Sequence, residues 1–148
     1  MRLVIQRVSR AEVRIEGETV ARIGLGLLLL LGVEKGDRDV QLDALAGKVL
    51  HMRVFEDNAG KMNLSALDRG AGILVVSQFT LAADLSRGRR PGFESAAPPA
   101  VAEPLYEAFV ARLRDSGLTV ETGRFGAYME VDLVNDGPVT FVLEAEMQ

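Results

Sequence analysis

The sequence has no cysteine and a single histidine, His51. The absence of cysteine excludes disulfides, thiolate nucleophiles, iron–sulfur clusters and cysteine zinc sites. With one histidine, a chain cannot form a two-histidine metal site, and any serine triad would have to use His51. These absences leave little room for the hydrolytic chemistry that depends on a nucleophilic thiol, a histidine base or a bound zinc ion.

Long hydrophobic runs are also missing. The longest unbroken apolar run, residues 27–31, is far shorter than the roughly 20 residues that a membrane-spanning helix needs. The first ten residues, MRLVIQRVSR, interrupt their apolar side chains with Arg and Gln, unlike a secretory signal. We therefore expect a soluble cytoplasmic protein with no membrane attachment.

The length and composition are those of a globular domain. A chain of 148 residues is expected to fold around one core, so we predict one domain over residues 1–148. Hydrophobic residues make up 48% and charged residues 26% of the sequence, which excludes extensive disorder. The net charge of −4 argues against binding nucleic acid over the whole surface, because phosphate contacts need local positive charge.

Apolar patterns predict more strands than helices. Residues 27–33 form a short apolar run bounded by glycines, as in a buried strand. Residues 135–138, Asn-Asp-Gly-Pro, predict a turn between the last two strands. The expected strands cover residues 3–5, 13–15, 19–23, 27–33, 73–77, 118–121, 128–134 and 139–144, with a further turn-rich stretch within 54–65.

Two segments have helical spacing. Apolar residues recur at helical intervals over 42–50, with Asp37 as the expected N-cap, and His51 falls opposite the centre of this stripe, where we expect it to be exposed. A second stripe over 105–113 predicts a helix with Pro104 in its first turn and Gly117 at its end. The predicted class is α/β, a single compact domain with a mixed β-sheet and two main covering helices.

Three segments carry residues that the fold alone does not need. Each of them also has a purely structural explanation. The segment SQFTL at 77–81 places three hydrogen-bonding side chains at the end of an apolar strand, although it also fits a plain strand end. The segment NDGPVT at 135–140 is either a specialised turn or a plain hairpin. The long loop over 83–99 carries Arg87, Arg89 and Arg90, which suit phosphate contacts with an RNA end or simply a solvated loop.

Taken together, SQFTL and NDGPVT resemble the two signature motifs of the D-aminoacyl-tRNA deacylases. Further similar segments follow in the same order along essentially the whole chain: MRLVIQRVSRAEV, EDNAGKMN, RRPGF, PLYEAF and GRFGAYMEVDLVNDGPVT. The resemblance implies a small α/β domain that acts as a cytoplasmic homodimer. It also implies hydrolysis, without a cofactor or metal, of the ester that joins a D-amino acid or glycine to the tRNA 3′ end.

The resemblance also implies where the site lies. In the family the glycine–proline pair is cis and enters the pocket of the partner subunit, so Gly137 and Pro138 are expected beside the partner's catalytic segment. That segment comprises Ser77, Gln78, Phe79 and Thr80. Backbone N–H groups near Phe79 and Thr80 would stabilise the oxyanion, and the RNA 2′-OH would assist the attack.

The roles of the other candidate residues are less specific. Thr80 is a nucleophile or a hydrogen-bonding group, and the absence of a neighbouring base in the sequence favours positioning. Arg7, in the first strand, is expected to brace the turn at 137–138. Phe125 and Met129 line the pocket or belong to the core.

An alternative function from another class is a non-catalytic nucleic-acid-binding dimer of the same fold, which would hold RNA or DNA through its arginines. Intact SQFTL and NDGPVT segments favour the enzyme.

Overall fold

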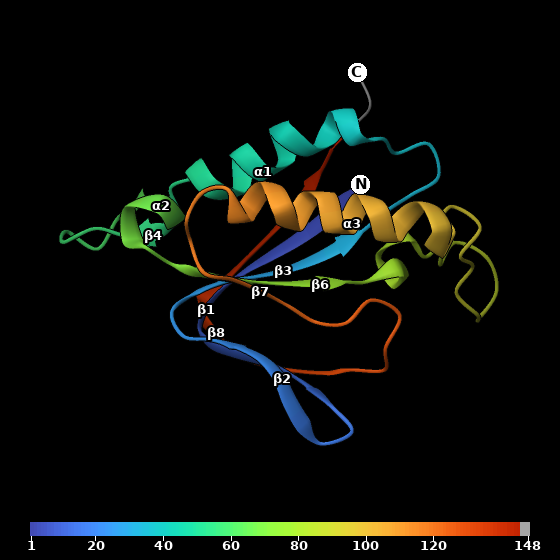
Figure 1. Ribbon diagram of the computed structural model, residues 1–148, viewed down its shortest axis with the longest axis horizontal. Helices are drawn as coiled ribbons and strands as arrows, with labels where there is room; N and C mark the ends of the chain where they lie inside the picture. The colour runs from blue at the N-terminus through green and yellow to red at the C-terminus, as the bar shows by residue number, and fades with distance from the viewer. Residues whose placement is uncertain (146–148) are drawn as a thin grey trace.

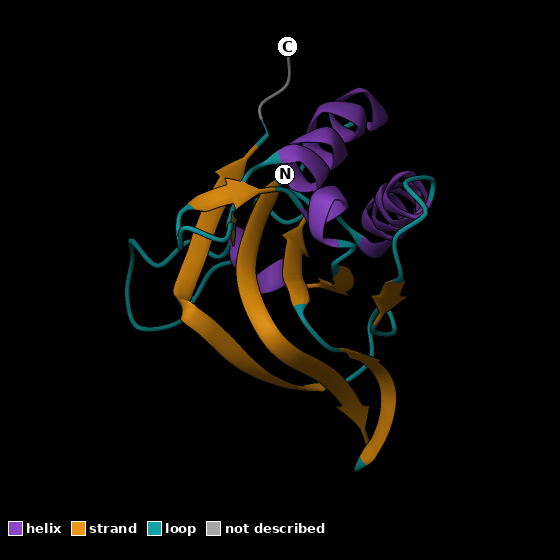
Figure 2. Ribbon diagram, turned by 90° about the vertical axis from the view of Figure 1, so that its left-hand side faces the viewer, coloured by secondary structure: helices purple, strands orange, loops and turns teal. Residues whose placement is uncertain are grey.

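A mixed β-sheet runs through the centre of the structure, a computed structural model that describes residues 1–145. The strand order is β2-β1-β3-β6-β7, and β8 pairs with the other edge of β1. The pairs β1–β2, β1–β3 and β1–β8 are antiparallel, whereas β3–β6 and β6–β7 are parallel. Two long, bent strands dominate the sheet, and Figure 2 shows their curvature. The strands are β1 (Arg2–Ile15), β2 (Glu18–Ile23), β3 (Gly26–Gly32), β6 (Gly72–Ser77), β7 (Val120–Thr122) and β8 (Glu130–Glu144), with a separate hairpin of β4 (Phe55–Glu56) and β5 (Met62–Leu64).

Two long helices cover one face of this sheet, as Figure 1 shows. They are α1 (Leu42–His51) and α3 (Pro99–Arg114), and a shorter helix, α2 (Ala66–Arg69), lies beside the small hairpin. The predicted α/β class with a mixed sheet and two main helices is confirmed. Among residues 1–145, no helix is long and apolar enough to cross a membrane.

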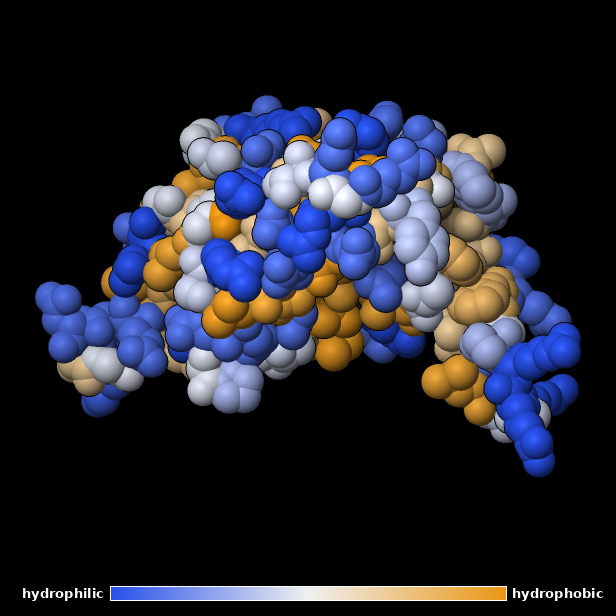
Figure 3. Space-filling model, turned by 90° about the horizontal axis from the view of Figure 1, so that it is seen from below, coloured by the Kyte–Doolittle hydropathy of each residue, from blue (hydrophilic) through white to orange (hydrophobic). Residues whose placement is uncertain are grey.

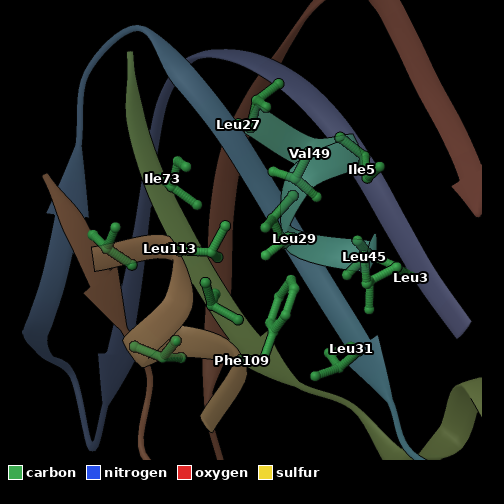
Figure 4. Packing of buried hydrophobic residues seen from close by; sticks show 14 of the residues in the cluster. Leu3, Ile5, Leu27, Leu29, Leu31, Leu45, Val49, Ile73, Phe109 and Leu113 are labelled. Carbon is green, nitrogen blue, oxygen red and sulfur yellow. The ribbon is translucent and has the colours of Figure 1, made fainter. Parts of the chain in front are cut away.

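The core has two parts because β3 and β6 are buried on both faces. Alternate residues of β3 point to opposite sides, so that Leu29 joins the cluster under the helices and Leu28 joins a smaller cluster on the other face. Figure 4 shows Leu29 packed near Phe109 of α3 and Val49 of α1. This two-sided burial explains why residues 27–31 form a continuous apolar run.

The starts of both long helices differ from the prediction. Helix α3 begins at Pro99, so Pro104 lies inside the helix and not in its first turn. Pro104 is exposed, and the carbonyl that loses its hydrogen-bond donor there is therefore open to water. Asp37 does not cap α1: its carboxylate accepts hydrogen bonds from the Met1 amino group at 2.7 Å and from the Glu34 N–H at 2.6 Å. A 3₁₀ turn, Asp39–Gln41, leads into α1 instead.

The predicted turn at 135–138 is also wrong, because β8 is one continuous strand. Gln6 pairs with Thr140 and Val8 pairs with Asn135, so residues 136–139 form a large bulge opposite Arg7. The Asn135 side chain closes the bulge by accepting the Val139 N–H at 2.7 Å and donating to the Val139 carbonyl at 3.1 Å. The Gly137–Pro138 peptide bond is cis, as the resemblance implied.

Candidate functional site

A cavity of about 710 Å³ opens at the carboxyl ends of β3 and β6. All four predicted catalytic residues, Ser77, Gln78, Phe79 and Thr80, line it together. The two predicted lining residues from the distant segment 125–129 also contribute to its wall, namely Phe125 and Met129. Its remaining wall is formed by Val33, Val76, Ala96, Ala97, Pro99, Ala102, Gly126, Ala127, Tyr128 and Val131. The lining contains no carboxylate, histidine, lysine or arginine.

The backbone after β6 has unpaired donors in residues that line this cavity. The chain leaves the sheet at Ser77 and enters a single 3₁₀ helix, η2 (Phe79–Ala82). The Gln78 N–H donates to the Leu31 carbonyl at 2.8 Å, and the Leu81 N–H donates to the Gln78 carbonyl at 3.3 Å. Within residues 1–145, the intervening N–H groups of Phe79 and Thr80 have no acceptor, as expected at the start of a helix. Two adjacent donors are therefore free for a ligand.

The side chains of the same segment are held by local contacts. The Gln78 amide Nε2 donates to the Thr80 Oγ1 at 3.1 Å. The Phe79 ring is 57% exposed and meets Phe93 edge to face, with ring centroids 5.0 Å apart. Because no ionisable base lines the cavity, nothing in it deprotonates the Thr80 hydroxyl. The arrangement suits binding and orientation of a ligand.

Tyr106 joins two parts of the chain next to the cavity wall. The buried Tyr106 of α3 donates its hydroxyl to the Val75 carbonyl at 3.2 Å, and its ring lies 5.9 Å from that of Phe125. Burial raises the pKa of Tyr106, so its hydroxyl stays protonated as a donor. Tyr106 was not predicted as a site residue, because its place in an amphipathic helix accounts for it equally well.

Two further aromatic residues, at the cavity or next to its wall, were not among the predicted site residues. Tyr128 lines the cavity and is 93% exposed, and Phe93 supports Phe79. Tyr128 lies between Ala127 and Met129 in the segment GRFGAYM, and nothing in that local pattern separates an exposed aromatic ring from a buried one.

Arg7 lies outside the cavity, against the bulge at 136–138. Its side chain is 5% exposed and donates to the Val54 carbonyl at 2.8 Å and to the Asp136 carbonyl at 3.1 Å. It also pairs with the carboxylates of Asp136 at 3.3 Å and Glu56 at 3.8 Å. Arg7 thus joins the bulge to β1 and to the small hairpin, which is a bracing position.

Gly137 and Pro138 are also outside the cavity of their own chain. Arg7 pairs with Leu27, which pairs with Ile73, and Ser77 lies four residues farther along β6. Two strands, β1 and β3, therefore separate the bulge on β8 from β6. Within one chain the two motifs form separate features.

His51 belongs to neither the cavity nor the bulge on β8. It is exposed at the C-terminus of α1, as the helical geometry predicts, and does not line the cavity. Among residues 1–145, no group of three or more histidine, aspartate or glutamate side chains is placed to hold a metal ion.

Comparison with known proteins gives a consistent result. The family described as D-Tyr-tRNA(Tyr) deacylase matches residues 4–144. A D-aminoacyl-tRNA deacylase of Dinoroseobacter shibae is 60% identical over 144 residues, which cover 97% of this chain and 99% of that protein. Another from Symbiobacterium thermophilum is 58% identical over 146 residues, covering 99% of this chain and 97% of that protein.

Solved structures share the fold. The c-Myc DNA Unwinding Element Binding Protein superposes with a TM-score of 0.93 at 42% sequence identity, over 99% of this chain and 100% of that one. A structure described as a "probable eukaryotic D-amino acid tRNA deacylase" superposes with a TM-score of 0.82 at 19% identity, over 96% of this chain and 97% of that one.

Proposed function

The chain belongs to the D-Tyr-tRNA(Tyr) deacylase family, and we infer from this membership that it hydrolyses the ester bond of D-aminoacyl-tRNA. The products are the free D-amino acid and tRNA, so the reaction is a chiral proofreading step. The observation that carries the inference is the match over residues 4–144, together with relatives as much as 60% identical over nearly their full length. We further propose that residues 1–148 act as one deacylase domain in the cytoplasm.

We propose that the aminoacyl end of the tRNA 3′ terminus enters the cavity beside residues 77–80. The free N–H groups of Phe79 and Thr80 would then bind the oxyanion that forms when the ester carbonyl is attacked. Gln78 and Ser77 would orient the substrate, and Thr80 would act as a hydrogen-bonding group. Because an aminoacyl ester is already activated, orientation and oxyanion binding supply much of the rate without a side-chain base.

The outer edge of β8 supports a homodimer. Within residues 1–145, β8 pairs only with β1, so its other edge has free backbone donors and acceptors. Three apolar side chains of β8 are exposed: Val134 by 42%, Phe141 by 39% and Val142 by 63%. An apolar strand edge of this kind is suited to an isologous contact with a second copy of the chain.

Such a dimer would bring the bulge of one chain to the cavity of the other. Gly137 and Pro138 are exposed and do not line the cavity of their own chain, so we propose that they enter the partner's cavity. Backbone atoms of this pair would occupy the space that an L side chain needs, and L substrates would be rejected by steric clash. Glycine has no side chain, so the same filter would also admit glycyl-tRNA.

The test compares matched D- and L-tyrosyl-tRNA as substrates of the purified protein, before and after dialysis against EDTA. We expect loss of the D ester, retention of the L ester and the same rate after dialysis. Equal rates on the two enantiomers would contradict chiral proofreading, and an EDTA-induced loss that zinc restores would contradict a metal-free site.

A second candidate function is non-catalytic nucleic-acid binding. The name of one solved structure, which is 42% identical to this chain, describes a protein that binds a DNA unwinding element. A chain with that function would bind D-tyrosyl-tRNA without shortening the lifetime of its ester, so the same assay separates the two candidates.

A further inference from the structure

The loop between Asp84 and Gly92 carries three arginines without partners. Arg87, Arg89 and Arg90 are exposed, and none of them forms an ion pair or hydrogen bond with another residue of the described part of the chain. Figure 3 shows hydrophilic residues gathered on a projection at the right of the molecule, on the side where Figure 1 draws this loop. The loop therefore forms a basic projection on a chain whose net charge is −4.

The projection is held in a defined position. Asp84 and Gly92 exchange two backbone hydrogen bonds of 2.7 and 2.9 Å at its base, and the Ser95 hydroxyl donates to the Ala82 carbonyl at 2.8 Å. Beyond the base, Phe93 packs against Phe79 of the cavity wall. Because these contacts fix the base of the loop, binding through its arginines would require little additional ordering.

The location of the loop connects it to the substrate. Thr80 and Ala96, on either side of the loop in sequence, both line the cavity, so the loop projects from the cavity rim. The cavity itself contains no charged side chain that would attract a phosphate. A polyanion approaching an acidic protein needs local positive charge next to the site, and this loop is where the structure provides it.

We propose that Arg87, Arg89 and Arg90 form a phosphate clamp for the backbone of the tRNA near its 3′ end. This proposal rests on the proposed function. Arginine suits this role because its planar guanidinium contacts phosphate through two parallel hydrogen bonds. Gly88, at the tip of the loop, lies four residues from each of the two paired residues at its base.

The experiment compares two substrates of the full-length protein: D-tyrosyl-tRNA and D-tyrosyl-adenosine, which has the same ester but no phosphates. The variant is Arg87→Gln/Arg89→Gln/Arg90→Gln. We expect the ratio of kcat/KM for the tRNA to that for the adenosine ester to fall by about 10- to 100-fold at low salt. The slope of log(kcat/KM) for the tRNA against log[salt] should become shallower by about two to three.

Two further variants serve as controls. Lys48→Gln/Lys61→Gln/Arg69→Gln removes the same number of exposed charges from α1, the β4–β5 turn and α2, and should leave the ratio unchanged. Arg87→Lys/Arg89→Lys/Arg90→Lys keeps the charge, and should keep most of the salt slope while losing part of the affinity. An equal fall with the control variant would overturn the clamp in favour of general electrostatic attraction.

Binding of uncharged tRNA, measured by filter binding, separates this proposal from the proposed function. If the wild type deacylates neither substrate, the proposed function fails, and the clamp is still supported if the arginine variant loses tRNA binding. An unchanged affinity and salt slope in the arginine variant would overturn the clamp, whatever the deacylation assay shows. An equal loss on both substrates would also overturn it.

Discussion

The chemistry of single residues at the cavity depends on hydrogen bonding, because no carboxylate, histidine, lysine or arginine lines it. Thr80 accepts a hydrogen bond from Gln78, so Thr80→Ala should remove one positioning contact and lower kcat by about tenfold. Removal of a covalent nucleophile would cost several further orders of magnitude. Single-turnover deacylation of D-tyrosyl-tRNA measures the loss. An aminoacyl ester trapped on Thr80 by acid quenching and detected by mass spectrometry would contradict the positioning role.

His51 has a side chain suited to acid–base catalysis, but it lies outside the cavity. It is exposed at the end of α1 and absent from the cavity lining. We expect His51→Asn to keep the deacylation rate within about threefold of the wild type, well short of the roughly hundredfold loss of a general acid or base. Circular dichroism confirms folding of the variant. A hundredfold loss in a folded variant would restore histidine catalysis as a hypothesis.

At the scale of elements, the end of β3 sets the position of η2. A Cβ added at Gly32 would lie 2.8 Å from the Leu81 Cβ and 3.1 Å from the Gln78 carbonyl oxygen. Gly32→Ala should therefore displace η2 and misalign the N–H groups of Phe79 and Thr80. We expect a loss of about 10- to 100-fold in kcat, because misplacement of up to 1 Å can have an effect of that size.

Gly24→Ala, in the turn before β3, is the control variant, since a Cβ there meets nothing within 4 Å. It should retain wild-type kcat in the same D-tyrosyl-tRNA assay. Urea unfolding of both variants shows how much of each effect comes from stability, where we expect about 1–3 kcal/mol for Gly32→Ala. Equal kcat values in the two variants would show that η2 is not set by its contact with β3.

At the scale of the whole molecule, the proposed site takes residues from two chains. Gly137 has φ +138°, and a Cβ there would lie 2.6 Å from the Val139 Cγ2, so Gly137→Val should distort the bulge. Thr80→Trp should fill the receiving cavity. Each variant homodimer carries its lesion in both sites and should be inactive. A mixed dimer combines one intact bulge with one intact cavity, so it should recover about half of the wild-type activity per dimer.

The heterodimer is obtained by co-expressing the two variants with different tags and purifying over both. Homodimers of each variant, purified in the same way, are the controls, and D-tyrosyl-tRNA is the substrate. A folded heterodimer without activity would show that each site is built within a single chain.

The sequence by itself determined the features that depend on neighbouring residues. The apolar run over 27–33 indicated a buried strand, helical spacing indicated α1 and the exposed side of His51, and two short motifs indicated the family. The predicted starts of the two long helices were wrong, because the residues expected to mark them have other surroundings in the folded chain. Asp37 binds the Met1 amino group in place of a helix end, and Pro104 is tolerated inside α3 on its exposed side.

Only the tertiary structure decided which of the predicted site residues lie close together. It placed Phe125 and Met129 against the segment 77–80, and it turned the expected hairpin at 135–138 into a bulge braced by Arg7. It also kept that bulge apart from the cavity in its own chain. The physical reason is that periodicity reports which face of an element a residue occupies, whereas strand order and register follow from contacts between residues distant in sequence.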